Sequence, residues 1–313
     1  MPKVSVIIPT RNRCALLPRA IESARRAGSS VEIVVVDDAS EDGTPEVCRV
    51  VNDIRYLRAR HRLGIGGARN VGLIASTSEY ITFLDDDDAR LPGSIDAQVE
   101  SLEAQPRAGM IYGKVLYGDE GCNPKGGSYP ERCPQGDLFW QLMSWNFIPC
   151  PTVVFRRACL LRVGLLDEAA QGIDDWDLWI RIAEFYPVLA TEQAVTIWRQ
   201  PTPTSGQFSF RAERMHRRAR HMHRDKWLRL PRAVEAGDER RREAALVFDE
   251  RATQQMIWEA SGALKAGRAR DFVRVAFALA RMYPLGASRR AFGASTWSFL
   301  MNGARGRWKD SRT

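Results

Sequence analysis

Short apolar segments alternate with helix-like segments over the first hundred residues, and this alternation limits the fold more than any other feature of the sequence. Residues 3–9 (KVSVIIP) and 32–36 (EIVVV) are rich in β-branched residues, and each is followed by polar residues and then by a helix-like stretch. A third apolar segment, 80–84 (YITFL), leads directly into four aspartates. Strands that alternate with helices at short intervals favour a mostly parallel sheet with helices on its faces. The sequence therefore predicts an α/β fold.

The length of 313 residues allows one large α/β domain with an appendage. With 44% apolar and 27% charged residues, the composition is typical of a globular protein. No apolar run approaches the roughly 18 residues that a membrane-spanning helix needs, and the start lacks the apolar core and cleavage site of a secretory signal. We therefore expect a cytoplasmic location. None of the six cysteines forms a C-x-x-C pair, which favours reduced, mostly buried thiols over a zinc site.

The charge is distributed unevenly along the chain. Residues 1–198 contain 21 Lys and Arg against 27 Asp and Glu, a net charge of −6, whereas residues 199–313 contain 25 against 11, a net charge of +14. A Pro/Ser-rich joint, PTPTSG, separates the two parts, and the sequence beyond it is Arg-rich and favours helices. An acidic body with a basic appendage suggests that the appendage meets an anionic partner: nucleic acid, a membrane surface or a phosphate-bearing acceptor.

Asp85–Asp88, the four consecutive aspartates, are the most informative chemical feature. Carboxylates packed at one strand end repel one another, and a cation is the natural compensation. Hard divalent ions such as Mg²⁺ and Mn²⁺ take carboxylate oxygens and can bridge to a diphosphate. The alternative is a solvated acidic turn. Because the run comes directly off an apolar strand, we favour the metal site.

Three other segments are ambiguous when each is taken alone. Asp37 and Asp38 follow the second strand, where they could cap a turn or accept from a ribose or base. In the glycine-rich segment HRLGIGGARNVG the third glycine of G-x-G-x-x-G is missing, so a flexible loop that brings Arg69 to a diphosphate is preferred over a dinucleotide motif. Acids in the first turn of the helix DDWDLWIRIAEF could cap it or, beside a tryptophan, act as a base.

Taken together, these motifs resemble family 2 of the inverting glycosyltransferases, which have the GT-A nucleotide-binding fold. The motifs VSVIIPTRNR, VVVDDASEDGT, GGARNVGLIAS, YITFLDDDD, VGLLDE and DDWDLWIRIA follow in that order over residues 3 to about 200. The resemblance implies a Rossmann-like α/β fold with a mixed central sheet and a C-terminal helical extension. Residues 1–110 would bind the nucleotide-sugar, 111–200 would hold the acceptor and the catalytic base in the same domain, and 201–313 would form the basic, mainly helical extension.

The resemblance also assigns roles to matching positions. Asp175 would be the catalytic base, and Asp87 the direct ligand of Mn²⁺ or Mg²⁺. The nucleotide of a UDP- or dTDP-sugar would be bound by Pro9, Thr10, Arg11, Asp38, Arg69 and Asp86, with Asp38 at the imide of uracil or thymine, Asp86 near the ribose and Arg69 at the base or diphosphate. Relatives often carry a His after the Arg of a later strand, where this chain has Gln200; Thr204 and Ser205 are the candidate substitutes.

Acceptor contacts are expected from Gly118–Gly136 and Trp140–Phe147, and the acceptor would be a hydroxyl-bearing glycan, glycolipid or small molecule. For residues 201–313 we expect peripheral contact with an anionic membrane or a lipid-linked acceptor; no nucleic-acid motif accompanies the arginines. In ARDFVRVAFALARMY, arginines form one stripe and nearly everything else is apolar, which fits a core helix or one in a membrane interface, the core being favoured.

Two rival functions remain at this stage. A sugar-1-phosphate nucleotidyltransferase would share the sheet and the acids, but it should have a Gly-rich, Arg- or Lys-bearing loop after the first strand, where this chain has PTRNRCALLP. A non-catalytic module that binds a nucleotide-sugar or an anionic surface is the other rival, and the intact aspartates argue against it.

Overall fold

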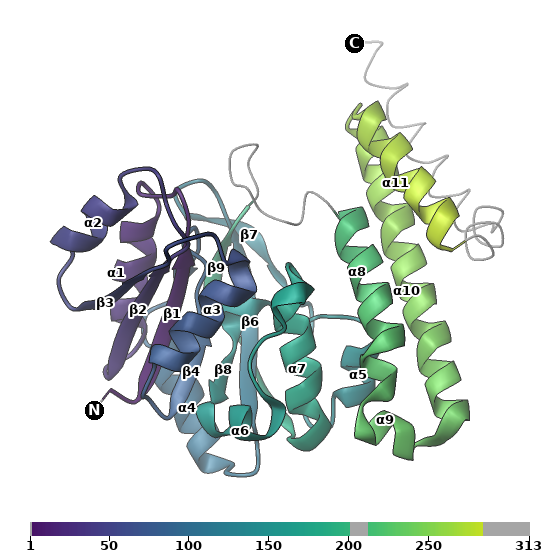
Figure 1. Ribbon diagram of the computed structural model, residues 1–313, viewed down its shortest axis with the longest axis horizontal. Coiled ribbons are helices and arrows are strands. Elements are labelled where there is room, and N and C mark those ends of the chain that lie inside the picture. The colour runs from purple at the N-terminus through teal and green to yellow at the C-terminus, as the bar shows by residue number, and fades with distance from the viewer. Residues whose placement is uncertain (1, 201–211, 284–313) are drawn as a thin grey trace. The chain divides into compact units, whose positions relative to one another are not determined.

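A computed structural model describes residues 2–200 and 212–283 of the chain (Figure 1). The chain divides into two compact units. The first comprises Met1–Leu142 and Asn146–Gln207, and the second comprises Met143–Trp145 and Phe208–Thr313. Each unit is considered by itself below.

The first unit is built on one mixed sheet of nine strands. Its order is β3-β2-β1-β4-β8-β6-β9-β5, and β7 pairs with β6 off this path. The first four strands of the order are parallel, β8 is antiparallel to both of its neighbours, and β6 and β9 are parallel to each other. The strands are β1 (Val4–Thr10), β2 (Val31–Asp37), β3 (Ile54–Arg58), β4 (Tyr80–Phe83), β5 (Ala89–Arg90), β6 (Met110–Gly118), β7 (Pro124–Tyr129), β8 (Val154–Arg156) and β9 (Val188–Arg199).

Helices cover both faces of this sheet, as Figure 1 shows. The long ones are α1 (Leu17–Ala27), α3 (Gly64–Ala75), α4 (Ser94–Ala104) and α7 (Asp174–Phe185), and the short ones are α2 (Thr44–Val50) and α6 (Leu160–Val163). The boundary between the two units falls inside another short helix, α5 (Phe139–Ser144). The predicted α/β fold with a mixed central sheet is therefore confirmed.

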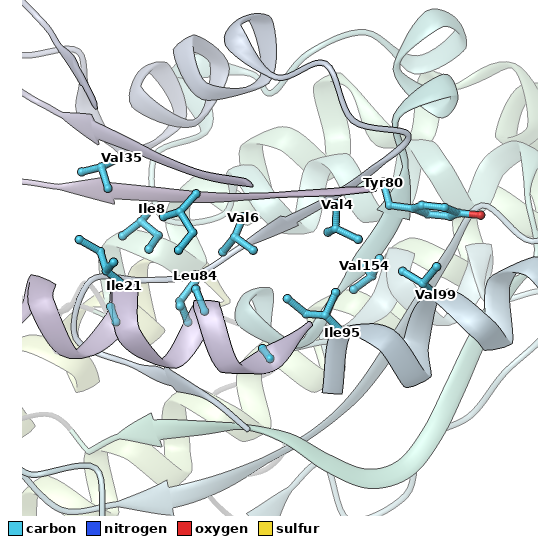
Figure 2. Packing of buried hydrophobic residues seen from close by; sticks show 14 of the residues in the cluster. Val4, Val6, Ile8, Ile21, Val35, Tyr80, Leu84, Ile95, Val99 and Val154 are labelled. Atoms are coloured by element: carbon cyan, nitrogen blue, oxygen red, sulfur yellow. The ribbon is translucent and has the colours of Figure 1, made fainter. Parts of the chain in front are cut away.

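Alternate residues of β1 face opposite sides of the sheet, and this decides where the helices pack. Val6 and Ile8 belong to a core cluster that includes Ile21 of α1 and Ile95 of α4 (Figure 2). Ile7 points to the other side, where it meets α3. All seven residues of β1 are buried, which explains its continuous apolar sequence, because a central parallel strand has no solvated face.

Aromatic packing holds α7 on the same face as α3. Trp179 is fully buried, with its ring 6.4 Å from Phe83 of β4 and 5.9 Å from Phe155 of β8. Phe83 is paired in register with Ile7 of β1. Consequently α3 and α7, which carry Arg69 and the predicted base, lie over one face of the sheet.

The Gly/Pro-rich segment Gly118–Gly136 is more ordered than the loop that its composition suggests. Pro124–Tyr129 forms β7, which pairs antiparallel with β6. Two glycines within it have positive φ, Gly126 at 89° and Gly127 at 79°, a conformation open to glycine at little cost. Both glycines lie within β7, at the irregularity in its pairing with β6, where the register shifts between Leu116 and Gly118.

The described part of the second unit is helical. It contains α8 (Ala212–Asp225), α9 (Pro231–Glu235), α10 (Gly237–Lys265) and α11 (Ala269–Met282). The C-terminal helices expected from the sequence are therefore present in this part of the chain. No helix among the described residues is both long and apolar enough to cross a membrane.

The histidines of α8 have different surroundings and share no metal within the described residues. His223 is buried, with its ring 4.2 Å from that of Phe248, and burial lowers its pKa to about 3. His216 stacks on Trp145, while His221 is exposed and pairs with Asp225. The buried histidines therefore contribute to packing.

Candidate active site

The four consecutive aspartates lie at the carboxyl end of β4, beside the carboxyl end of β1. β4 ends at Phe83, and Asp85–Asp88 follow after one residue. β1 is parallel to β4 and ends at Thr10, so both strands deliver their last residues to the same edge of the sheet. Ligands of open α/β sheets bind at this edge. Asp86 and Asp87 are buried, as is Asp88.

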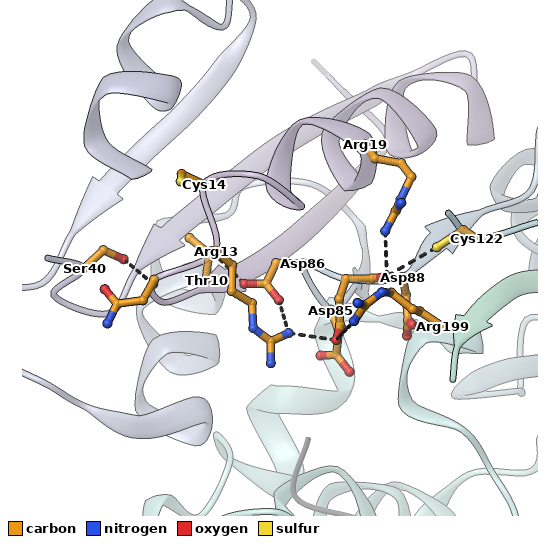
Figure 3. Close-up of polar contacts among 12 residues, drawn as sticks. Thr10, Arg13, Cys14, Arg19, Ser40, Asp85, Asp86, Asp88, Cys122 and Arg199 are labelled. Carbon is orange, nitrogen blue, oxygen red and sulfur yellow. Dashed lines mark hydrogen bonds and ion pairs between the residues drawn. The ribbon is translucent and has the colours of Figure 1, made fainter. Parts of the chain in front are cut away.

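Two residues at and after the end of β1 hold the middle of the aspartate run (Figure 3). The Thr10 hydroxyl donates to Asp86 Oδ2 over 2.7 Å. Arg13 Nη1 donates to Asp86 Oδ1 over 2.8 Å and lies 2.8 Å from Asp87 Oδ2 in an ion pair. One guanidinium group therefore bridges two neighbouring carboxylates.

The last residue of β9, Arg199, approaches the same run. Its backbone N–H donates to Asp88 Oδ1 over 2.9 Å, and its Nη1 lies 3.8 Å from Asp87 Oδ2. The carbonyl oxygen of Asp87 accepts from Arg19 of α1 and from the Cys122 thiol, each over 3.4 Å (Figure 3). The run is thus bonded through both its side chains and its backbone.

Burial and mutual repulsion raise the pKa of these carboxyl groups. Burial raises the pKa of Asp86 to about 7; the Arg13 guanidinium opposes this shift and the Asp87 carboxylate adds to it. Burial followed by repulsion from Asp87 and Asp85 raises the pKa of Asp88 well above its usual value. The pKa of Asp87 is also raised, chiefly by burial, against the pull of Arg13. Carboxylates held this close together are stabilised in their charged form by nearby cations.

Arg69 of α3 connects the aspartate run to the acidic start of α7. Its Nη2 lies 2.9 Å from Asp85 Oδ1, and its Nη1 lies 2.8 Å from Asp174 Oδ2. The side chain is almost entirely buried, and the guanidinium carbon is 5.2 Å from the centroid of the Phe83 ring. Because one side chain reaches both acidic segments, the end of β4 and the start of α7 border a single site.

Asp175 lies beside this ion pair, in the first turn of α7, and is partly exposed. Burial raises its pKa to about 7, repulsion from Asp174 adds to the shift, and Arg69 opposes it. A carboxyl group with a pKa near neutrality suits a general base. Asp177 has a different environment, because it is fully buried and pairs with Arg181 one helical turn later, at 2.8 Å.

The glycine-rich segment is helical, so the prediction of a flexible loop around Arg69 was wrong. α3 begins at Gly64. At Gly72, an added Cβ would lie 2.4 Å from Ile7 of β1, which is closer than packed carbon atoms approach. The missing side chain therefore serves close packing of helix on strand, and that packing fixes the position of Arg69.

The two acids at the end of β2 are bonded within the protein. Asp37 is fully buried, accepts from the Tyr56 hydroxyl over 2.7 Å and accepts from the backbone N–H of Ser40 over 2.8 Å. The two oxygens of Asp38 accept from two backbone N–H groups at the start of α3. Each carboxylate oxygen has a second lone pair, so the contact of Asp38 with a base imide stays a prediction.

Pro9 and Arg11 flank Thr10. Pro9 is buried and lies in register with Val36 of β2. Arg11 is partly exposed, but its Nη1 is buried and has no hydrogen-bond partner among the described residues. An unpaired buried N–H is unfavourable, and guanidinium groups suit phosphate oxygens. The nucleotide contacts of both residues remain predictions.

The acids of this site fit a divalent cation that arrives with a diphosphate. Among residues 2–200 and 212–283, no three His, Cys, Asp or Glu side chains surround a common metal position. However, Mg²⁺ at phosphate sites commonly takes one or two carboxylates and completes its shell with water and substrate phosphates. Asp87 supplies a buried carboxylate for that arrangement, and its Oδ2 lies within ion-pair distance of Arg13 and Arg199.

Sequence reasoning missed Arg13 and Arg19. The available signal was the spacing of basic residues in PTRNRCALLPR, which follows a strand whose neighbour ends in aspartates. Arg199 was noticed only as the neighbour of Gln200. The suggested substitutes, Thr204 and Ser205, lie outside the described residues.

Comparison with known proteins identifies the family. The sequence profile of "Glycosyl transferase family 2" matches residues 5–161, half of the chain. A GalNAc(5)-diNAcBac-PP-undecaprenol beta-1,3-glucosyltransferase of Campylobacter jejuni is 37% identical over an alignment of 220 residues that covers 66% of this chain and 68% of that protein. The chain belongs to glycosyl transferase family 2 and is a glycosyltransferase.

Solved structures show the same fold. A fragment of Staphylococcus aureus TarS in complex with UDP-GlcNAc has a TM-score of 0.61 at 16% identity, covering 88% of this chain and 80% of that one. The mannosyltransferase PcManGT from Pyrobaculum calidifontis, in complex with GDP-Man and Mn²⁺, has a TM-score of 0.54 at 21% identity, covering 99% of this chain and 88% of that one. These likenesses confirm the GT-A fold and extend no further.

Proposed function

We propose that the chain transfers a sugar from a UDP- or dTDP-sugar to an acceptor hydroxyl, with a divalent cation and with inversion at the anomeric carbon. The observation that carries this proposal is the bridge made by Arg69 between Asp85 and Asp174. This bridge brings two kinds of acid to one site. The aspartate run is suited to a cation bound to a diphosphate, and the acid at the start of α7 is suited to base catalysis. Residues 1–110 then bind the donor, 111–200 bind the acceptor and supply the base, and 201–313 form the extension.

The binding roles follow from the chemistry of each side chain. Pro9, Thr10 and Arg11 lie along the nucleotide, where the buried, unpaired Nη1 of Arg11 is suited to an anionic oxygen. Asp38 accepts from the base imide, and Asp86 lies near the ribose. The donors that support these proposals belong to neighbours: a TarS complex contains UDP-GlcNAc, and a PcManGT complex contains GDP-Man and Mn²⁺.

The catalytic step depends on two opposite charges. As the glycosidic bond breaks, negative charge grows on the departing diphosphate, and Arg69 stabilises it. Bound at Asp87, Mn²⁺ or Mg²⁺ would supply Lewis-acid stabilisation of the same oxygens. Asp175 takes the proton of the acceptor hydroxyl while that oxygen forms the new bond from the opposite face. The products are the glycoside, the nucleoside diphosphate and a protonated Asp175.

A lipid-linked acceptor at an anionic membrane is the partner we propose. The Campylobacter relative is named for an undecaprenol-linked diphosphate substrate, and residues 199–313 carry a net charge of +14. On α11, Val273 and Phe277 are 62% and 67% exposed, and they share a helix face with the exposed Arg270 and Arg281. Apolar residues flanked by arginines on one face suit a membrane interface. The opposite side of α11 is buried, as the core interpretation predicted.

Two experiments test the proposal. Purified protein should hydrolyse UDP-glucose or dTDP-glucose slowly to the nucleoside diphosphate, and EDTA should abolish the reaction until Mn²⁺ is restored. Formation of UTP and glucose-1-phosphate from UDP-glucose and added pyrophosphate instead would indicate a nucleotidyltransferase. Sedimentation with phosphatidylglycerol vesicles should occur at low salt and weaken as salt is added. An absence of binding at low salt would refute the membrane contact but leave the transferase proposal intact.

A further inference from the structure

Arg13 occupies the position at the aspartate run where a cation is most needed. Its Nη1 lies 2.8 Å from Asp86 Oδ1 and 2.8 Å from Asp87 Oδ2 (Figure 3). The Arg13 side chain is 21% exposed, whereas those of Asp86 and Asp87 are 7% and 2% exposed. The guanidinium therefore supplies positive charge to two buried carboxylates.

A divalent cation and this guanidinium compete for the same carboxylate. Mg²⁺ binds carboxylate oxygens at about 2.0–2.1 Å, and Arg13 Nη1 is already 2.8 Å from Asp87 Oδ2. If the cation and the Arg13 guanidinium both contacted that oxygen, a double and a single positive charge would lie within a few ångströms of each other. Such a pair of charges is strongly unfavourable away from bulk water. Arg13 therefore opposes binding of the cation to Asp87, and its withdrawal would remove that opposition.

The other arginines at the run are less suited to this exchange. Arg19 bonds to carbonyl oxygens, those of Asp87 and Glu120. Arg199 Nη1 lies farther from Asp87 Oδ2, at 3.8 Å. Arg199 is the last residue of β9, and its backbone N–H donates to Asp88 of the run. Arg13 is in the connection between β1 and α1, where a side chain can change its partner without moving a strand.

We propose that Arg13 is a built-in counter-cation, which holds the aspartate run while the donor is absent and leaves Asp87 when the metal enters. Metal binding to the free protein is therefore weak. The diphosphate of the donor, an anion adjacent to the metal, strengthens metal binding because it accepts the released guanidinium. Arg13 acts as a positioning residue that couples the metal to the nucleotide. This inference rests on the metal dependence in the proposed function.

The test measures Mn²⁺ binding directly, through the electron paramagnetic resonance signal of unbound Mn²⁺, with and without UDP. Removing the charge in Arg13→Gln should tighten Mn²⁺ binding to the UDP-free protein by roughly tenfold or more, since close charge pairs of this kind have large coupling energies. The strengthening of Mn²⁺ binding by UDP should shrink accordingly. Arg19→Gln is the matched control: it removes the same charge from a residue bonded to the backbone carbonyl of Asp87, and it should tighten UDP-free Mn²⁺ binding much less than Arg13→Gln does.

Each result decides between distinct conclusions. Suppose that the unaltered protein binds Mn²⁺ in the presence of UDP, but that Arg13→Gln without UDP binds Mn²⁺ no more tightly than the unaltered protein without UDP. The counter-cation role of Arg13 is then wrong, and the proposed function survives. If the unaltered protein binds no Mn²⁺ even with UDP, the metal dependence and this inference are both wrong. If circular dichroism shows that Arg13→Gln is unfolded, Arg13→Lys is measured in its place. The single ammonium group of lysine cannot hold both carboxylates, so Mn²⁺ binding should tighten by a smaller factor. If Mn²⁺ binding to Arg13→Lys does not tighten, the inference is wrong.

Discussion

The ends of β2 and β4 both carry adjacent aspartates, yet the two groups are in opposite states. Asp37, at the end of β2, accepts from Tyr56 and from a backbone N–H and lies 3.5 Å from Arg58 Nε in an ion pair, and its neighbour is bonded by the start of α3. At the end of β4, Asp86 and Asp87 repel each other, and one arginine holds them together. The bonds of Asp37 stabilise the fold, whereas the second group leaves repulsion that a ligand can relieve.

This contrast separates structural acids from functional acids by their partners rather than by their position. Carboxylates whose oxygens are satisfied by donors of the protein, without a second carboxylate beside them in the same ion pair, are structural, because removing them leaves those donors unpaired. Carboxylates that repel one another at a ligand edge are candidates for function, since burial and this repulsion raise their pKa and a bound cation would offset both effects. Substitutions at the two strand ends and at α7 should therefore affect different properties.

The largest expected effect is on catalysis, at Asp175. Asp175→Asn should reduce the rate constant of transfer by about a hundred- to ten-thousandfold, the usual contribution of general-base help, while UDP binding is unchanged. Steady-state kinetics and calorimetry with UDP measure the two quantities. Asp177→Asn is the control, because Asp177 is paired with Arg181; it should lower the melting temperature and keep the rate per folded molecule. Full transfer by Asp175→Asn would remove this residue from the mechanism.

Next in size is the effect of Asp87→Asn. Losing the metal's charge stabilisation, about 4 kcal/mol, corresponds to roughly a thousandfold lower transfer rate. Stability should not fall, because the substitution removes one of several mutually repelling buried charges and Arg13 keeps its bond to Asp86. Chemical denaturation and transfer assays on the same preparation check both statements. A large loss of stability with normal activity would place Asp87 with the structural acids.

The opposite outcome is expected at Asp37, in the β2 group. Asp37→Ala leaves the Tyr56 hydroxyl and a buried backbone N–H without their acceptor, which should lower the free energy of unfolding by about 1–3 kcal/mol. Activity per folded molecule should change little. Urea denaturation measures the loss, and Tyr56→Phe, which removes one of the donors, should cost less. Equal stability of Asp37→Ala and the unaltered protein would contradict the structural role.

The strands could be predicted because their physical cause is local. β-branched runs such as VSVIIP form buried central strands, and the place where such a strand stops is visible in the sequence, which is why Asp85–Asp88 could be assigned to a ligand edge. Family resemblance then supplied individual roles. The short strands of the second half, such as β8 with three residues, offer too little periodicity for the same treatment.

What could not be predicted depends on partners distant in the chain. Arg69 and Asp174 are 105 positions apart, and Thr10 and Asp86 are 76 apart, so no spacing pattern indicates that they meet. Asp37 and Asp87 belong to similar D-D motifs, and only their surroundings distinguish them. The glycines of α3 were misinterpreted for a related reason: whether a missing side chain provides freedom or close packing depends on the strand that it faces.

The smallest expected effect is the dependence of the transfer rate on pH, which distinguishes Asp175 from an ordinary surface acid. Because burial raises its pKa to about 7, the base is protonated and inactive below that value, so the transfer rate should rise about tenfold per pH unit up to about 7 and then level off. The sign follows from the role, since only the ionised carboxylate can take the hydroxyl proton. The residual rate of Asp175→Asn should lack this rise. A rate that levels off already near pH 4, the range of a solvated carboxyl, would show that the base is not held in this environment.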